Sequence, residues 1–313
     1  SLGTGRDDNW KALTSGTSGI REISRFPTDD LRTTFAGTVD FVRAEPFSVP
    51  ELTQRLADLA IEEAITQAGI GAKGDFPGPM FMAVPPIEIE WSQRRTLAAE
   101  VAAGGENGEI DYPSLLKIAR DGHADLHHRF LFGSVAERLK EKFGTKGMPL
   151  SLSTACASGG TAIQIGLETI RRGDTEAALV VGTDGSINAE ALIRFSLLSA
   201  LSTFSGPPEG ASRPFSKNRD GFVMAEGAAA VVLESLDHAL ARGATILGVV
   251  EGCGERADTF HRTRSSPDGH AIIGAIRDAL DDAGVEPGEV DYINAHGTGT
   301  PENDKMEHLG LET

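Results

Sequence analysis

The chain contains two cysteines, and the first of them, Cys156, stands where a nucleophile could work. In LSLSTACASGG an apolar run stops at the cysteine and small residues follow it, which predicts a strand, a tight turn and then a helix. Unpaired N–H groups and the helix dipole favour negative charge at a helix start, so a thiol there ionises more easily. The thiolate is the nucleophilic form of cysteine. A buried structural cysteine is the alternative interpretation.

A partner for this thiolate is offered by His296 in NAHGTGTPEND, at the expected end of another strand. The glycines of that segment would let a substrate arm lie against the main chain. The hydroxyls of Thr298 and Thr300 could bind the arm. Thr300 is also the expected N-cap of a helix that begins at Pro301. A single histidine is more often an ordinary surface or core residue, so the argument depends on both segments together.

Three stretches, STACASGG, ASRPFSKNRDGFVMAEGAA and NAHGTGTPEND, together resemble the elongating 3-oxoacyl-[acyl-carrier-protein] synthases in sequence, order and spacing. The resemblance extends over essentially the whole chain. It implies an α/β fold, the thiolase-like layered αβαβα arrangement of two related halves. The first half would comprise residues 1–242 with the cysteine. Residues 243–313 would begin the second half, which carries the histidine loop and is incomplete here.

The resemblance also implies a role for each candidate residue. Cys156 would take an acyl group from an acyl carrier protein, and His296 would assist decarboxylation of malonyl carrier protein. The resulting enolate would attack the acyl thioester, a decarboxylative Claisen condensation that elongates fatty acids. Thr298 and Thr300 would hold the phosphopantetheine arm, and Glu307 would support the site from behind. No metal or other cofactor is implied, and the resemblance predicts a homodimer.

The sequence departs from the family pattern at several points. The chain ends at EHLGLET, before the motif that carries a second catalytic histidine and a lysine, and neither Lys305 nor His308 matches that motif. The first strand of the family is also missing upstream of SLG, so we expect a chain truncated at both ends. Ala225 replaces the usual glycine, and a specialised, long-chain substrate would fit such changes. Basic candidates for carrier docking are Arg43, Arg55, Lys140, Lys142 and Lys146.

Three other interpretations remain open. A coenzyme A-dependent thiolase-like acyltransferase is disfavoured by the NAHGTGT loop, which resembles the carrier-dependent branch. A non-catalytic partner subunit of a synthase pair typically lacks the nucleophile, whereas Cys156 is present. An inactive fragment that only binds or dimerises is kept open by the missing second histidine.

Composition excludes several other classes of function. The net charge is −17, which disfavours nucleic-acid binding because phosphate contacts need lysine and arginine. No window holds 18 uninterrupted apolar residues, so no membrane span is expected. The N-terminus lacks the pattern of a signal peptide. A cytoplasmic protein with Cys156 and Cys253 reduced is therefore expected.

The elements that must position these residues alternate between strands and helices. Several strands are apolar throughout, which predicts parallel strands covered on both faces. Helical spacing is found at 49–69, 133–144, 161–173 and 268–284. Strands are predicted at 80–84, 149–154, 177–182, 228–236, 246–252 and 290–297. The turn-rich segment 203–221 is predicted to be a long loop that serves a site or an interface.

Two further motifs fail their context tests. GIGAKG (69–74) matches the dinucleotide-binding pattern but follows a helix and precedes prolines. HADLHH (123–128) places His123 and His127 on one helical face, where zinc would need another ligand. A surface helix is the more economical interpretation of the second motif.

Overall fold

The computed structural model describes residues 2–44, 47–71, 74–104, 111–261 and 264–313. Its internal contacts divide the chain into two compact units, each assembled from segments that are distant in sequence. Unit 1 comprises Ser1–Asp40, Ile187–Glu226 and Ala239–Thr313. Unit 2 comprises Phe41–Ser186 and Gly227–His238.

Unit 2 is built on a four-stranded sheet with the strand order β4-β3-β5-β6. The strands are β3 (Met80–Ala83), β4 (Leu150–Leu152), β5 (Ala177–Asp184) and β6 (Gly227–Glu234). β3 runs parallel to both β4 and β5, as the apolar strand composition predicts. β6 runs antiparallel to β5, so the prediction of parallel strands is wrong there. β6 is an edge strand and only partly buried, so it does not need the complete coverage typical of parallel strands.

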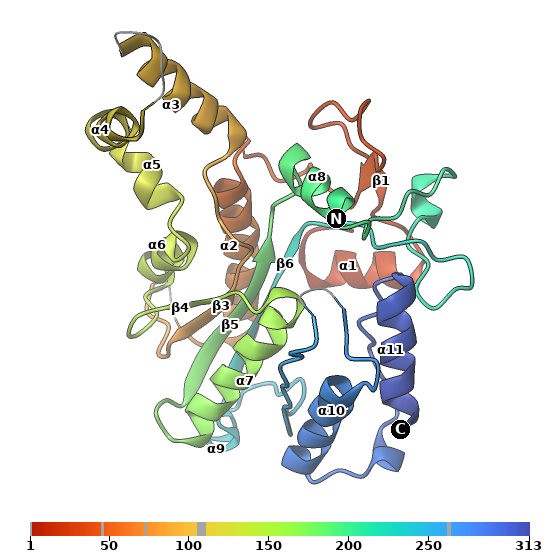
Figure 1. The fold of residues 1–313 in the computed structure, drawn as a ribbon. Coiled ribbons are helices and arrows are strands. Elements are labelled where there is room, and N and C mark those ends of the chain that lie inside the picture. The colour runs from red at the N-terminus through yellow and green to blue at the C-terminus, as the bar shows by residue number, and fades with distance from the viewer. Residues whose placement is uncertain (1, 45–46, 72–73, 105–110, 262–263) are drawn as a thin grey trace. The chain divides into compact units, whose positions relative to one another are not determined.

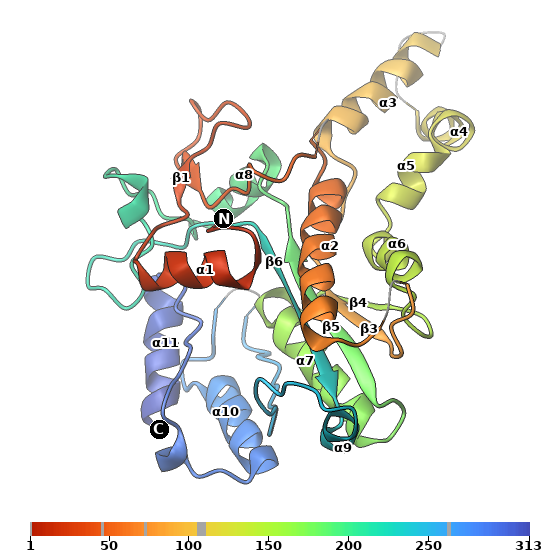
Figure 2. The same cartoon turned by 180° about the vertical axis from the view of Figure 1, so that it is seen from behind.

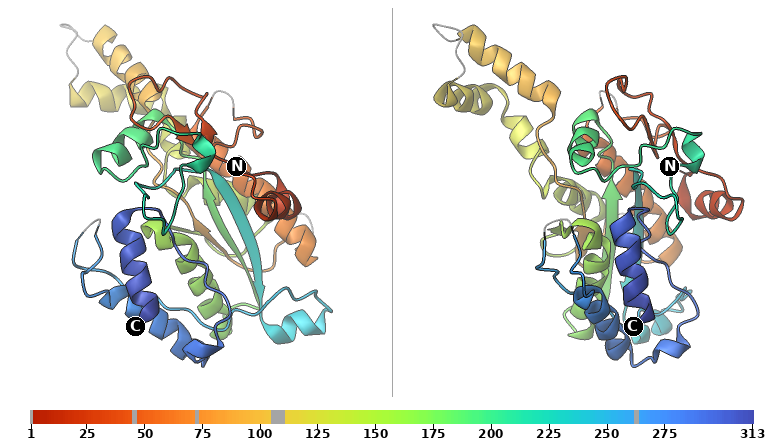
Figure 3. Two further views of the ribbon diagram at one scale, coloured as in Figure 1. Left: turned by 90° about the vertical axis from the view of Figure 1, so that its right-hand side faces the viewer. Right: turned by 45° about the vertical axis from the view of Figure 1, so that its right-hand side comes forward.

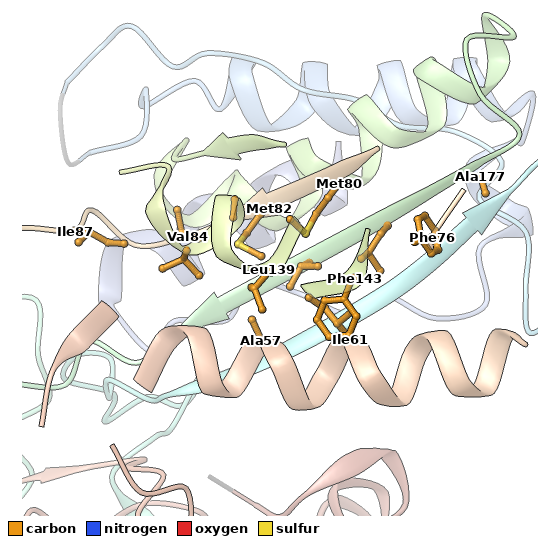
Figure 4. Close-up of a cluster of buried hydrophobic side chains, with 14 of the residues drawn as sticks. Ala57, Ile61, Phe76, Met80, Met82, Val84, Ile87, Leu139, Phe143 and Ala177 are labelled. Atoms are coloured by element: carbon orange, nitrogen blue, oxygen red, sulfur yellow. The ribbon is translucent and has the colours of Figure 1, made fainter. Parts of the chain in front are cut away.

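Two helices cover the opposite faces of this sheet, α2 (Val49–Ala68) and α7 (Ser158–Arg171), as Figures 1 and 2 show from opposite sides. Successive strand residues point to alternate faces. Met80 and Met82 accordingly join a core cluster with Ile61 of α2, drawn in Figure 4. Phe81 packs instead with Ala162 of α7. The sheet therefore holds α7, and with it the turn that carries Cys156, against a rigid surface.

The rest of unit 2 is helical. α6 (Ser134–Phe143) adds Leu139 and Phe143 to the first core cluster. α3 (Trp91–Gly104) and α4 (Tyr112–Gly122) pack against one another, and α5 (Ala124–Arg129) leads from α4 to α6. In Figure 1 the α3–α4 pair lies away from the sheet.

Unit 1 contains mostly helices and irregular chain. Its elements include α1 (Gly5–Thr14), α8 (Ala189–Leu197) and a two-stranded pairing of β1 (Arg21–Glu22) with β2 (Phe35–Ala36). α10 (His270–Ala283) packs against α11 (Pro301–Glu312), and the two lie side by side in both views of Figure 3. The short helix α9 (Leu236–Ala241) falls at the boundary between the units. The loop predicted at 203–221 is confirmed and contains only the 3₁₀ turn η2 (Pro208–Gly210).

The strands predicted at 246–252 and 290–297 are wrong. Neither segment pairs with a strand in the described part of the chain, and their apolar side chains are exposed, as Leu247 (73%) and Tyr292 (80%) show. A strand needs a hydrogen-bonded neighbour and a surface to cover it, and periodicity in one segment reports neither. The predicted helices at 49–69, 133–144, 161–173 and 268–284 are confirmed as α2, α6, α7 and α10.

Candidate active site

Cys156 lies in a 3₁₀ turn, η1 (Ala155–Ala157), between β4 and the first residue of α7. Its side chain is an exposed thiol, and the strand–turn–helix context predicted for it is confirmed. Ala155, the residue before it, adopts a left-handed backbone conformation with φ of 53°. Such a conformation is unfavourable for a residue with a Cβ atom and marks a tightly constrained turn. The arrangement presents the sulfur at the start of a 14-residue helix.

His296 is carried by a loop that Glu307 of α11 holds through the main chain. The carboxylate of Glu307 accepts hydrogen bonds from the N–H groups of His296 and Gly297, the latter at 2.8 Å. Gly297 and Gly299 are both left-handed, and a Cβ on Gly299 would lie 2.9 Å from the carbonyl oxygen of Gly221. Glycine is therefore required at that close approach. Glu307 therefore fixes the backbone of the histidine loop.

The two threonines of the loop face one another. Their Oγ1 atoms are 2.9 Å apart, and Oγ1 of Thr298 also accepts from the N–H of Thr300. Oγ1 of Thr300 accepts from the N–H of Asn303, which confirms the predicted N-cap of α11. His296, Thr298, Thr300 and Glu307 thus form one structural element within unit 1. Cys156 belongs to unit 2.

Sequence reasoning missed Asp304, the best buried carboxylate of this element, with 1% of its surface exposed. It accepts hydrogen bonds from the N–H groups of Phe215 at 2.7 Å and Gly299 at 3.1 Å. Nε of Arg219 lies 3.3 Å from the same carboxylate, although the angle does not make a hydrogen bond. Asp304 therefore joins the 203–221 loop to the histidine loop. The sequence shows only that Asp304 falls in the first turn of a helix, where acids are favoured, and its two N–H partners depend on how the two loops fold.

The 203–221 loop also contains an ion pair between Arg213 and Asp220 that braces it. Arg213 donates to Asp220 at 2.8 Å and stacks over the ring of Phe204. Partial burial of Asp220 opposes ionisation. Hydrogen bonds from Ser202 and Arg213 outweigh it and lower the pKa of that carboxyl below its ordinary value.

A second brace fixes the motif that ends in AEGAA. The carboxylate of Glu226 is fully buried and accepts from both terminal nitrogens of Arg25, at 2.6 and 2.9 Å. It also accepts from the N–H groups of Val39 and Ile187, at 2.9 and 3.1 Å. All four contacts lie within unit 1. The pair is therefore satisfied on every side, as a buried ion pair must be.

The basic residues considered for carrier docking are largely engaged with acids of unit 2. Lys142 binds Asp58 and Glu62, Lys146 binds Asp75, and Arg55 pairs with Glu51. These exposed pairs reduce the net positive charge of the surface that they share. Burial lowers the pKa of Lys142, but the hydrogen bonds that it donates to Asp58 and Glu62 outweigh this effect, and the net shift of the pKa is upward.

The remaining motifs do not form ligand sites. His123 binds Glu100 at 2.7 Å, and within the described ranges no group of histidine, cysteine, aspartate or glutamate side chains could hold a metal ion. Gly69 of GIGAKG is the left-handed cap of α2, while residues 72–73 of that motif lie outside the described residues. Each helix in the described ranges is too short or too polar to cross a membrane.

Comparison with known proteins identifies the family. Residues 1–239 match the model of the beta-ketoacyl synthase N-terminal domain, and residues 247–313 match that of the C-terminal domain. The chain therefore belongs to the beta-ketoacyl synthase family, whose members are acyltransferase-type condensing enzymes. The resemblance stated from the sequence is confirmed. The domain boundary after residue 242 stays a prediction.

The relatives include enzymes of two pathways. The chain is 34% identical to 3-oxoacyl-[acyl-carrier-protein] synthase 2 of Coxiella burnetii, over 99% of this chain and 73% of that protein. It is 33% identical to a putative polyketide beta-ketoacyl synthase 1 of Streptomyces cyaneus, over 97% of this chain and 72% of that protein.

Solved structures agree on the fold. One is a type II polyketide acyl-carrier protein in complex with its ketosynthase, with a TM-score of 0.83 and 27% identity over 99% of this chain and 74% of that chain. Another is a beta-ketoacyl synthase from Burkholderia phymatum, with a TM-score of 0.77 and 30% identity over 99% and 74% of the two chains. The fold is therefore the α/β, thiolase-like fold of the ketosynthases.

Proposed function

We propose that the chain provides the acyl-accepting and decarboxylating residues of a 3-oxoacyl-[acyl-carrier-protein] synthase that elongates fatty acids. The observation that carries the proposal is the exposed thiol of Cys156 at the start of α7, in a chain of the beta-ketoacyl synthase family. A thiolate at a helix start can attack a thioester while main-chain N–H groups stabilise the developing oxyanion.

The proposed reaction has two stages. The Cys156 thiolate attacks the acyl thioester of an acyl carrier protein, and the carrier thiol leaves. Malonyl carrier protein then loses carbon dioxide, and His296 stabilises the enolate that this leaves. The enolate carbon attacks the acyl-enzyme carbonyl, and the Cys156 thiolate departs from the 3-oxoacyl product. Thr298 and Thr300 bind the phosphopantetheine arm, and Glu307 holds the histidine loop. The steps require neither a metal nor a redox cofactor.

Polyketide synthesis is the second candidate. A polyketide synthase of Streptomyces cyaneus is about as similar to this chain as the 3-oxoacyl synthase of Coxiella burnetii is. The two candidates share the same site chemistry and differ in the length and oxidation state of the chain they extend. A comparison of condensation with saturated acyl and with polyketide thioesters distinguishes them.

A carrier protein and a second copy of this chain are the proposed partners. A neighbour structure contains a ketosynthase with its acyl-carrier protein, which supports the first. The second is supported by β4, which forms an edge of the sheet and leaves Leu150 42% exposed. An exposed edge strand offers unpaired main-chain groups to another copy of itself.

Acyl transfer to Cys156 tests the proposed function directly. Intact mass would be measured before and after incubation with an acyl carrier-protein thioester. We expect one acyl increment on the native protein and on Cys253→Ala, the matched cysteine control, and none on Cys156→Ala. An increment that persists in Cys156→Ala would contradict the assignment of the nucleophile. A folded native protein without any increment would favour a non-catalytic partner subunit or an inactive fragment.

Transfer from acyl-coenzyme A is the matched test of the thiolase-like alternative. We expect it to be slower than transfer from the carrier protein. Faster transfer from coenzyme A would favour a carrier-independent acyltransferase.

A further inference from the structure

The turn before Cys156 contains a conformation that alanine does not favour by itself. Ala155 has φ of 53°, and it is one of three non-glycine residues in the described part of the chain with positive φ. Its methyl side chain offers no hydrogen bond that could offset the strain. The conformation therefore depends on contacts that its neighbours make.

The hydroxyl of Ser158 makes contacts on both sides of this residue. Its Oγ accepts a hydrogen bond from the N–H of Thr154 at 2.8 Å and donates one to the carbonyl oxygen of Ala155 at 2.7 Å. These groups belong to the residue before Ala155 and to Ala155 itself. The Ser158 hydroxyl thus donates one hydrogen bond and accepts another, and together they fix the backbone on both sides of the strained residue Ala155.

Burial distinguishes Ser158 from the turn that it holds. Ser158 is 8% exposed, whereas Thr154, Ala155 and Cys156 are all exposed. Ser158 is also the first residue of α7, whose helical conformation is regular from that point. The packed helix α7 therefore holds Ser158 in place, and the hydrogen bonds of the serine hydroxyl fix the exposed turn relative to that helix.

We propose that Ser158 is a positioning residue for the nucleophile, and this rests on the proposed role of Cys156. The hydroxyl keeps the turn that carries Cys156 in place directly before the N-terminus of α7. The electrostatic effect of a helix start falls off within the first turn of the helix, and a small displacement of a reacting atom costs much of its reactivity. Ser158 thereby controls thiolate formation without contacting the substrate.

Alkylation of the cysteines tests this without any substrate. Iodoacetamide labelling would be followed by mass spectrometry from about pH 5 to about pH 10, a range that brackets ordinary cysteine ionisation. Cys253 in the same sample serves as the internal reference. In Ser158→Ala we expect Cys156 to react about tenfold more slowly at neutral pH, with the midpoint of its pH profile moved upward. Ser158→Thr, which keeps the hydroxyl, should retain the native profile.

Thr169→Ala is the matched control on the same helix. The Oγ1 of Thr169 donates to the carbonyl oxygen of Ile165 at 2.6 Å, and both residues lie beyond the first turn of α7. This variant should leave the Cys156 profile unchanged. An equal change in Thr169→Ala, or a native profile in folded Ser158→Ala, would overturn the proposal.

A second variant separates positioning from folding. Glycine adopts the conformation of Ala155 without strain. In protein that carries Ala155→Gly, adding Ser158→Ala should therefore change the pH profile of Cys156 alkylation less than it does in the native background. An undiminished response in that background would contradict the proposed link through Ala155. Failure of the proposed function has a different signature. The native protein would then take no acyl group, while the alkylation profiles would still differ between native protein and Ser158→Ala.

Discussion

The carboxylate of Glu307 contacts the main chain of the histidine loop at two consecutive residues. It accepts from the N–H groups of His296 and Gly297, and the amide of Asn303 lies 3.4 Å from it. Hydrogen bonds to a charged group contribute about 1.5–3 kcal/mol each. Glu307 therefore determines where the loop backbone lies, and the ring of His296 follows from that placement.

Replacing Glu307 should separate the two stages of the proposed reaction. In Glu307→Gln one oxygen becomes an NH₂ group that faces an N–H donor, so one charge-assisted hydrogen bond is lost. We expect condensation to slow by about 10–100-fold, which corresponds to about 1.4–2.7 kcal/mol, with acyl transfer to Cys156 retained. Single-turnover condensation of pre-acylated protein with malonyl carrier protein measures this.

Glu302→Gln is the control for this prediction, because Glu302 lies on the same helix but 4.0 Å from an exposed Arg264. It should condense at the native rate. Equal rates in Glu307→Gln and native protein would show that the loop does not depend on this carboxylate.

At the scale of elements, α7 is positioned by close packing against the sheet. Gly166 faces β5 and β6, and a Cβ there would lie 3.0 Å from side-chain atoms of Val180 and Leu233. A larger side chain would push the helix away from the strands. Because Cys156 and Ser158 stand at the start of the same helix, this contact sets the height of the candidate site above the sheet.

Gly166→Leu should therefore destabilise unit 2. Overpacking of this kind costs about 1–3 kcal/mol, which would lower the urea concentration at the midpoint of unfolding. Gly122→Leu is the matched control, since Gly122 also lies in a helix and has open space around its Cβ position. A native midpoint in Gly166→Leu would show that α7 can shift at no cost.

Periodicity predicted the long helices and the buried strands well, because α2, α7 and β5 carry their own apolar pattern. The prediction of a strand at 246–252 was wrong because that segment is as apolar as the true strands, whereas strand formation also requires pairing with other segments. The sequence analysis did not predict α3 or α4. α3 has only a weak apolar face, and its buried residues are Leu97 and Val101. Cys156 and Thr300 could be placed from local turn and cap signals. The contacts of Asp304 and Ser158 could not be predicted from the sequence, since their hydrogen-bond partners are main-chain groups whose positions depend on the backbone conformation.

At the scale of the whole molecule, neither unit is a continuous piece of sequence. The chain leaves unit 1 after Asp40, returns at Ile187 and passes through unit 2 again from Gly227 to His238. A cut anywhere between these points would therefore leave both units incomplete. The edge strand β4 of unit 2 is where we propose that two copies of the chain meet.

A charge at that edge should reduce self-association. The proposed homodimer has about twice the chain mass of 33.0 kDa, and in Leu150→Lys we expect the mass in solution to fall towards that of one chain, since lysine on an edge strand opposes strand pairing. Light scattering coupled to size-exclusion chromatography measures this mass. Met148→Lys changes an 86% exposed residue just outside β4 and should leave it unchanged. An unchanged mass in Leu150→Lys would place any self-association elsewhere.

The strand order has a consequence for synthesis of the protein. β3 can pair on one side only after β5 has been synthesised, and β5 can pair with β6 only after β6 has been synthesised. The sheet is therefore complete only when residue 234 has been made. About 150 residues separate Met80 from that point, which takes about 8–30 s at about 5–20 residues per second. For the first part of that interval, until β5 has been made as far as Asp184, the apolar segment MFMA lacks at least one of the two strands that flank it. The nascent chain therefore exposes this apolar segment before the sheet that supports the nucleophile turn is complete.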